Sequence, residues 1–357
     1  LQAEAAVQTL EGELRGYPLR AKGEVRFDAG QLSFNAIEVF SGGNQALLEG
    51  TAGELYDLRW SIQAPELETL WSELSGVLNA QGTLTGKAAT PRLVASIDAQ
   101  EVVFKEYMIG SLQGQTDLKL DGRQQLALHL QAAELALGER VWDELSLHLT
   151  GLREKHHLEM QLIGQEVPEL RLDIDAALDE QYMWKGTLQQ MTLELLEFGN
   201  WELESPAGFS LGNQAQSLQK VCLVSEAAGF CGSFTAQADK AWKGQVHAAN
   251  LPFSILQHWM PLDTKISGYG NLVSEFSAAS DGGLRANAEL GIPEASLAFE
   301  LTGEAQSIDF SGSSLTVKVD QESTRSELNL PLAGLGGIQG NVTLPGFQPM
   351  EMNLEGQ

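Results

Sequence analysis

The sequence is short of positive charge and of long apolar runs. Of its 357 residues, 22 are Lys or Arg and 48 are Asp or Glu, so the formal net charge is −26. Nucleic-acid binding needs a basic surface that neutralises phosphates, and adhesion to anionic headgroups needs a polybasic patch, so the acid excess excludes both classes. No apolar run reaches the roughly 18 residues that a membrane-spanning helix needs.

Cysteine is also scarce. The chain has two, Cys222 and Cys231, which flank a turn-like segment at 225–229 and could face each other across a hairpin. A disulfide there would contribute about 2.5–3 kcal/mol on the chain-entropy model. Two buried free thiols are the alternative, whereas a zinc site needs more ligands than this neighbourhood supplies. Pairing would favour an oxidising compartment.

A chain of this length would ordinarily divide into domains, yet no linker-like run interrupts it. Similar segments follow Trp60, Trp184 and Trp242, at intervals that fit a unit of about 60 residues. We therefore expect one continuous elongated segment, 1–357, built from repeats. The approximate repeat units are 1–64, 65–187 (two units), 188–250 and 251–357.

Strict alternation of apolar and polar residues is the main signal for secondary structure. Leu126, Leu128 and Leu130 are separated by Ala127 and His129, and similar runs recur about every dozen residues between Gly- and Asp-rich turns. This period of two is typical of strands with one apolar face in an antiparallel meander. The sequence therefore predicts an all-β protein.

Three segments instead have helical spacing. Apolar residues in 65–74 recur at i, i+3, i+4 and i+7 after Pro65, which favours a helix start. Leu188, Met191, Leu195 and Phe198 form a second stripe, and a third lies between Pro252 and Pro261. We expect short helices at these places, near the repeat boundaries.

The apolar face of such a sheet must be covered by something. The chain has 55 Leu against 13 Phe, 7 Trp and 5 Tyr, although β-branched and aromatic residues normally dominate strands. A leucine-lined surface is soft and uniform, which suits mobile alkyl chains. A sandwich, barrel or solenoid that closes on a solid core is the alternative.

Several motifs resemble one family. They are LSGVLNAQGTLTG at 74–86 followed by PRL at 91–93, WKGTL at 184–188, WELESPA at 201–207, the two Cys segments, and ISGYGNL at 266–272. In this order the chain resembles the TamB family of AsmA-like, repeating β-groove proteins of the bacterial envelope. The resemblance covers essentially the whole chain. The motifs of the family's N-terminal anchor and C-terminal domain are not found in it, so the resemblance implies an internal segment.

The resemblance implies a long antiparallel sheet curled into an open, U-shaped apolar groove in the periplasm of a Gram-negative bacterium. It implies a non-enzymatic role in moving phospholipid between the membranes, or in autotransporter assembly. The partners would be phospholipid, a TamA-like outer-membrane barrel and the inner membrane, the last two through regions absent here. The expected groove lining is Leu118, Leu120, Leu126, Leu128, Leu130, Leu145, Leu147, Leu149, Leu158, Met160, Leu162, Leu170, Leu172, Ile174, Leu297, Phe299, Leu301, Leu315, Val317, Val319, Leu328 and Leu330.

No catalytic constellation stands out, so we expect no enzyme, no cofactor and no metal. His156 and His157 are adjacent on a strand and would point to opposite faces, so they cannot share a metal ion. Asp173 and Asp175 share a face with Arg171, which is typical of a solvated surface. A secreted β-solenoid or adhesin is the main rival function, and a β-helix glycosidase is disfavoured because no exposed carboxylate cluster stands out.

Overall fold

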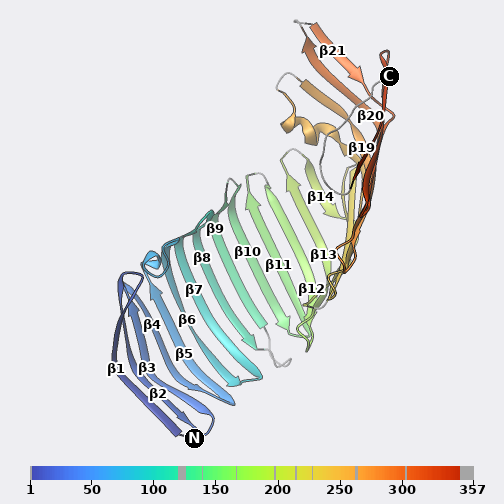
Figure 1. Cartoon of the computed structure of the whole chain (residues 1–357). Coiled ribbons are helices and arrows are strands. Elements are labelled where there is room, and N and C mark those ends of the chain that lie inside the picture. Colours follow the sequence, from blue (N-terminus) through green and yellow to red (C-terminus); the bar gives the residue numbers. More distant parts are fainter. Residues whose placement is uncertain are drawn as a thin grey trace. The chain divides into compact units, whose positions relative to one another are not determined.

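The computed structural model describes residues 2–345, apart from 120–125, 139, 166, 197, 214, 227, 262–263 and 302–303. Within these residues it contains 24 strands and two short 3₁₀ helices (Figure 1). The strand pairings are antiparallel throughout the described ladders. The predicted all-β, antiparallel fold is thus confirmed. The chain divides into two compact units, Leu1–Asp179 and Glu180–Gln357.

The first unit is a meander in which each strand pairs with the next one along the chain. Such a connection needs only short turns, which the Gly- and Asp-rich segments supply. Its strands are β1 (Gln2–Leu14), β2 (Tyr17–Asp28), β3 (Gln31–Ser41), β4 (Asn44–Ala52), β5 (Leu55–Ala64), β6 (Leu74–Lys87), β7 (Thr90–Phe104), β8 (Tyr107–Lys119), β9 (Leu126–Leu137), β10 (Arg140–Leu152), β11 (Lys155–Gly164) and β12 (Glu169–Leu178).

The second unit continues the same plan with two interruptions. Strands β14 and β15 lie end to end between β13 and β16, and β21 and β22 both pair with β20. Pro206 lies in the first break, where a residue without an N–H cannot continue a ladder. The strands are β13 (Trp184–Leu195), β14 (Gly199–Leu203), β15 (Ala207–Leu211), β16 (Ala215–Ser225), β17 (Ala228–Gln237), β18 (Trp242–Pro252), β19 (Thr264–Ala278), β20 (Leu284–Leu301), β21 (Glu304–Asp309), β22 (Ser313–Val319), β23 (Ser323–Leu332) and β24 (Gly336–Pro345).

β-Bulges interrupt the ladders of the first unit. Between β6 and β7 the register shifts between Ser75 and Val77, where Gly76 has φ +113° and Glu101 has φ +50°. A Cβ on Gly76 would lie 2.6 Å from the carbonyl oxygen of Glu101, so only glycine fits there. Bulges increase the local twist and bend the strands, which curves the sheet.

Two of the three predicted helical segments contain short 3₁₀ helices. Helix η1 (Leu67–Thr69) lies within 65–74, and η2 (Phe253–Trp259) lies between the two prolines. The prediction for the stripe from Leu188 to Phe198 is wrong, because that stretch lies mostly in β13. Met191, Leu193 and Leu195 also alternate with polar residues, and β14 and β15 supply pairing partners, so strand pairing decides the conformation.

No conventional core exists in the described part of either unit. The buried apolar residues are mostly small, such as Ala64, Ala99, Ala132 and Ala248, and no large side chain is fully buried. Each unit is therefore a single layer of sheet whose leucines pack beside one another without a second layer over them. The repeat boundaries expected from the tryptophan spacing stay a prediction.

Asn44 fixes the η1 segment to the turn between β3 and β4. Its side-chain amide nitrogen lies 2.8 Å from the carbonyl oxygen of Glu66 and 2.6 Å from Oγ1 of Thr69. Its Oδ1 accepts the backbone N–H of Glu66 at 3.1 Å. Asn44 is only 5% exposed, so these groups cannot exchange their partners for water.

We expect Asn44→Ala to destabilise the first unit by about 2–3 kcal/mol, because it leaves several buried polar groups unsatisfied. Urea unfolding followed by circular dichroism measures this change. Asn79→Ala is the matched control, since Asn79 is exposed in β6 and surface changes usually stay within about 0.5 kcal/mol. Equal effects of the two variants would contradict the proposed anchoring role.

Candidate functional site

Apolar side chains form rows that cross the strands of the first unit on one face. Leu147 in β10 lies directly opposite Leu130 in β9 and Met160 in β11, and Met160 lies opposite Leu172 in β12. The predicted proximity of Leu147 and Met160 on neighbouring strands is confirmed. Directly opposed residues in a sheet share a face, so these four side chains form one continuous aliphatic row.

Two parallel rows flank this one, and they contain most of the other groove-lining residues predicted for the first unit. One row consists of Leu128, Leu149, Leu158 and Ile174. The other consists of Leu145, Leu162 and Leu170, with Ala132 at the corresponding position of β9. Leu126 lies opposite Gly151 on the same face, and Leu118 lies opposite Leu93. Leu120 lies outside the described residues.

The second unit has the same arrangement. Leu315 lies between Leu290 and Leu328, and Val317 lies opposite Ala288. Leu290 and Leu297 of β20 are an odd number of residues apart, so a regular strand would place them on opposite faces. A register irregularity opposite 269–271 of β19 adds one residue to β20 between them, which keeps the two leucines on the same face. Three further predicted positions, Phe299, Val319 and Leu330, follow this alternation; the side chain of Leu301 is outside the description.

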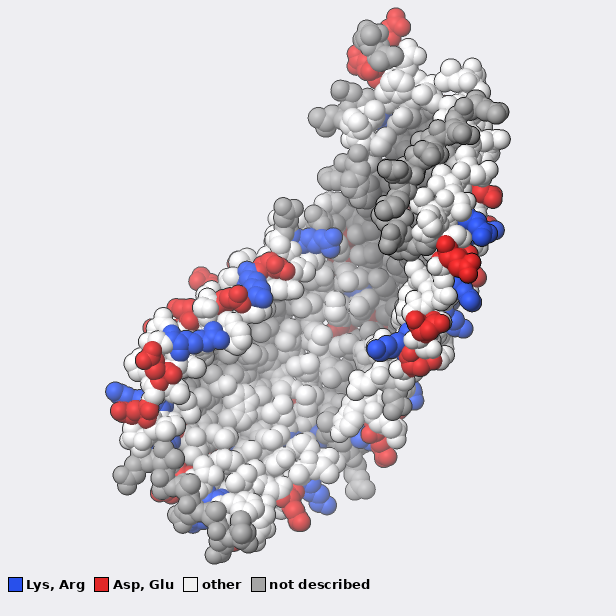
Figure 2. Space-filling model, viewed as in Figure 1, with Lys and Arg blue, Asp and Glu red and all other residues white. Residues whose placement is uncertain are grey.

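The leucine face of the first unit is hollowed and carries few charges. Arg171, Asp173 and Asp175 alternate with Leu172 and Ile174 and therefore point to the opposite face. Figure 2 shows a hollowed surface over this unit with few Lys, Arg, Asp or Glu side chains, while charges gather along its rim. The leucines are partly buried and leave a hydrocarbon surface in contact with solvent.

Aromatic residues opposite glycines interrupt the leucine rows, and the sequence reasoning did not assign them to this face. Trp60 lies opposite Gly82, and a Cβ on Gly82 would lie 2.8 Å from the indole. Phe276 lies opposite Gly244 in the same way in the second unit. An aromatic ring covers the gap that a glycine leaves in a sheet. For Phe276 the available signal was the segment Trp242-Lys243-Gly244, which contains the glycine that it covers.

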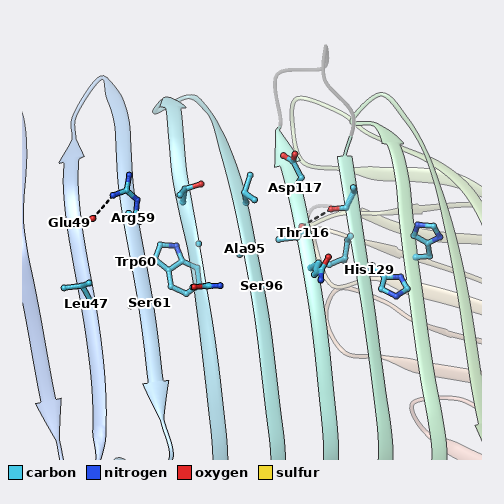
Figure 3. Close-up of a pocket in the computed structure, with 18 residues that line it drawn as sticks. Leu47, Glu49, Arg59, Trp60, Ser61, Ala95, Ser96, Thr116, Asp117 and His129 are labelled. Carbon is cyan, nitrogen blue, oxygen red and sulfur yellow. Dashed lines mark hydrogen bonds and ion pairs between the residues drawn. The ribbon is translucent and has the colours of Figure 1, made fainter.

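The opposite face of the first unit is polar and bears a depression of about 740 Å³ (Figure 3). Its lining mixes hydroxyl and amide side chains, such as Ser61 and Gln81, with apolar ones, such as Leu47 and Val94. At its edge Arg92 donates to Asp117 at 2.7 Å, and this hydrogen bond lowers the pKa of the Asp117 carboxyl despite partial desolvation. Most side chains of this lining lie on the face opposite to the leucine rows.

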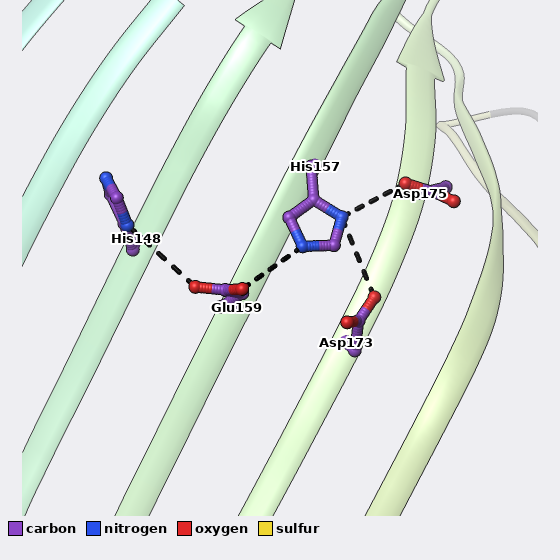
Figure 4. A network of polar contacts seen from close by, with 5 residues as sticks. All are labelled: His148, His157, Glu159, Asp173 and Asp175. Atoms are coloured by element: carbon purple, nitrogen blue, oxygen red, sulfur yellow. Dashed lines mark hydrogen bonds and ion pairs between the residues drawn. The ribbon is translucent and has the colours of Figure 1, made fainter.

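The two adjacent histidines of β11 point to opposite faces, as predicted. His156 is 6% exposed, and its Nδ1 lies 3.2 Å from the carbonyl oxygen of Leu152. His157 lies on the polar face among carboxylates from its own strand and from β12 (Figure 4). The hydrogen bond to Asp175 raises the pKa of the His157 imidazole despite partial desolvation, with further contributions from Asp173 and Glu159.

Comparison with known proteins assigns the chain to a family. The sequence pattern of the family "TamB, N-terminal domain" matches residues 1–357. The chain belongs to the TamB family.

A relative of this TamB-family chain is the translocation and assembly module subunit TamB of Haemophilus influenzae. The two are 24% identical over 217 residues, which is 60% of this chain and 16% of the relative. No solved structure matches the chain. In the described part, no helix has both the length and the apolar character needed to cross a membrane.

A disulfide joins two strands of the second unit. Cys222 in β16 and Cys231 in β17 are directly opposed, with Cα atoms 4.0 Å apart, and their sulfurs are bonded. This agrees with the hairpin placement expected from the sequence. The bond lies between the turn of this hairpin and the ladder irregularity between Leu218 and Val221.

We expect the double variant Cys222→Ser/Cys231→Ser to lose about 2.5–3 kcal/mol of stability in the second unit, because the unfolded chain regains loop entropy. The urea concentration at which β16 and β17 are half unfolded, followed by hydrogen exchange, measures this loss of stability. Reductant should lower the wild-type midpoint equally and leave the variant unchanged. A reductant effect that persists in the double variant would contradict this origin.

Proposed function

We propose that this chain is a segment of a non-enzymatic conduit that carries phospholipid acyl chains along its leucine face. In the proposal it works in the periplasm, between the inner and outer membranes, as part of a translocation and assembly module. The observation that carries the proposal is the continuity of the apolar rows from strand to strand, with no second layer of sheet over them within the described residues of either unit.

The direction of the rows favours transport along the sheet. A row that crosses strands runs perpendicular to them, and nine strands from β4 to β12 at a spacing of about 4.8 Å would give a path of roughly 38 Å. Each buried CH₂ group contributes about 0.8 kcal/mol, so an alkyl chain gains at every position along such a row. Because most neighbouring positions are aliphatic, we expect movement between them to meet no large step in free energy.

The charges of the molecule suit a headgroup that stays in water. The net charge of −26 repels lipid phosphate, so weak headgroup binding would favour transit over capture. The acyl chains would lie against the leucines, and the headgroup would remain at the open side of the hollow. This arrangement needs no catalytic residue and no cofactor.

The partners in this proposal follow from the family. The relative from Haemophilus influenzae is named as a subunit of a translocation and assembly module. We infer that this chain takes part in a similar module, with a TamA-like outer-membrane barrel and an inner-membrane anchor contacted by other regions of a longer protein. Client polypeptides in place of lipid are the second candidate, and an adhesin with a solid core is disfavoured by the absence of large, fully buried side chains among the described residues.

Two adjacent residues of β10 provide the test. Leu147→Arg places a cation on the leucine face, and Ser146→Arg places the same cation on the polar face, opposite Gln131 and Gln161. An unpaired charge in a hydrocarbon environment costs of the order of several kcal/mol, so we expect Leu147→Arg to reduce co-purified phospholipid about tenfold or more. Ser146→Arg should match the wild type in lipid extraction and mass spectrometry.

A photo-crosslinking amino acid at the same two positions identifies the occupant. We expect phospholipid adducts from position 147 and few from position 146, in the full-length protein in cells. Adducts of polypeptide at 147 would favour the client-protein candidate instead. Equal lipid content in both arginine variants would overturn the conduit, since the leucine face would then not be the binding surface.

A further inference from the structure

A group of titratable side chains on the polar face of the first unit is not explained by the conduit. His157 Nδ1 lies 3.0 Å from Asp175 Oδ1 and 3.6 Å from Asp173 Oδ1. On the other side of the ring, Nε2 lies 3.4 Å from Glu159 Oε1 (Figure 4). Three carboxylates from β11 and β12 thus converge on one imidazole.

The hydrogen bond to Asp175 determines which ring nitrogen can bind a ligand. A neutral imidazole carries one N–H, and the shortest contact assigns it to Nδ1, which donates to the Asp175 carboxylate. Nε2 then lies on the side of Glu159 Oε1, where either a proton or a metal ion can lie between the two atoms. A carboxylate that orients a histidine through its other nitrogen is the usual support of a metal ligand.

The spacing of the donor atoms fits a small metal ion. Zn–N and Zn–O bonds of about 2.0–2.2 Å at tetrahedral angles place neighbouring donors roughly 3.3–3.6 Å apart. The 3.4 Å between His157 Nε2 and Glu159 Oε1 lies in this range. One donor atom from each of His157, Glu159 and Asp173 lies within 4.8 Å of the others, so small side-chain rotations would bring all three to one ion.

A second histidine is in place to complete the set. His148 in β10 lies directly opposite Glu159, with its Nδ1 3.9 Å from Glu159 Oε2. The ring of His129 in β9 meets that of His148 edge to face, with centroids 5.6 Å apart, and so restricts its orientation. The nearby Arg171 pairs with Glu169 at 2.6 Å.

We propose that His157, Glu159 and Asp173 bind a divalent transition metal ion of the Zn²⁺ class, with His148 as a fourth ligand and Asp175 as a positioning residue. Imidazole nitrogens together with carboxylates suit zinc, copper and nickel, whereas Mg²⁺ and Ca²⁺ prefer sites made of oxygen alone.

The site would brace the strands that carry the leucine rows. Its ligands come from β10, β11 and β12, and Leu158, Met160 and Leu172 alternate with them on the opposite face. A metal that binds only the folded sheet raises its stability in proportion to the logarithm of metal concentration. The proposal does not depend on lipid transport, because the two sites lie on opposite faces and are measured separately.

Titration of ZnCl₂ into the purified, metal-free chain by calorimetry is the direct test. We expect one ion per chain and a higher unfolding temperature with zinc, no heat with Mg²⁺ or Ca²⁺, and the visible absorption of tetrahedral Co²⁺ when cobalt replaces zinc. His157→Asn and Glu159→Gln should each weaken binding by about 100-fold or more. Asp175→Asn should weaken it by about 10- to 100-fold, the range for residues that orient a ligand.

His247→Asn is the matched control. His247 is an exposed histidine of β18 in the second unit, opposite Cys231 and Val273, and its replacement should leave binding unchanged. Circular dichroism checks that each variant is folded, and Glu159, at 61% exposed, is the safer position if His157→Asn is unstable. Absence of zinc binding up to about 1 mM, or binding unaffected by Glu159→Gln, would overturn the proposal.

Discussion

The rest of this structure depends on one constraint, namely that a single layer of sheet must keep most of its apolar side chains on one face, although no second layer packs against that face. Alternation along each strand and matched register between strands both serve this constraint. Where a strand gains a residue, as β20 does between Leu290 and Leu297, the bulge restores the phase so that the apolar row continues. A surface maintained with this regularity and left open is the physical basis of the proposed lipid path.

The two faces of the sheet therefore have different roles in the proposals. The leucine face of the first unit offers a uniform hydrocarbon surface with few charges, and its softness favours movement over fixed binding. The polar face holds the ion pairs, such as Arg92 with Asp117, and the carboxylates around His157. Because side chains from one strand alternate between the faces, any group that ties β10 to β12 on the polar side also holds Leu147, Met160 and Leu172 in register.

Period-two patterns were reliable in the sequence where they were long. They predicted the strands, the separation of His156 from His157, and the hairpin that brings Cys222 to Cys231. They were misleading from Leu188 to Phe198, where a helical spacing coincided with an alternation of Met191, Leu193 and Leu195 and the ladder with β14 and β15 prevailed. Short segments carry both periods at once, and only the presence of a hydrogen-bonding neighbour distinguishes them.

By itself the sequence determined which side chains share a face within a strand that has no bulge, since that follows from the geometry of a single strand. It also determined the charge and the leucine content that distinguish the two faces. Only the tertiary structure decided which residues of different strands meet, because register depends on turns and bulges whose effect is not visible in the pattern. Glu159 and Asp173 are opposed across β11 and β12, and Trp60 covers Gly82 across β5 and β6, for this reason. The curvature that hollows the leucine face has the same origin, in bulges distributed over many strands.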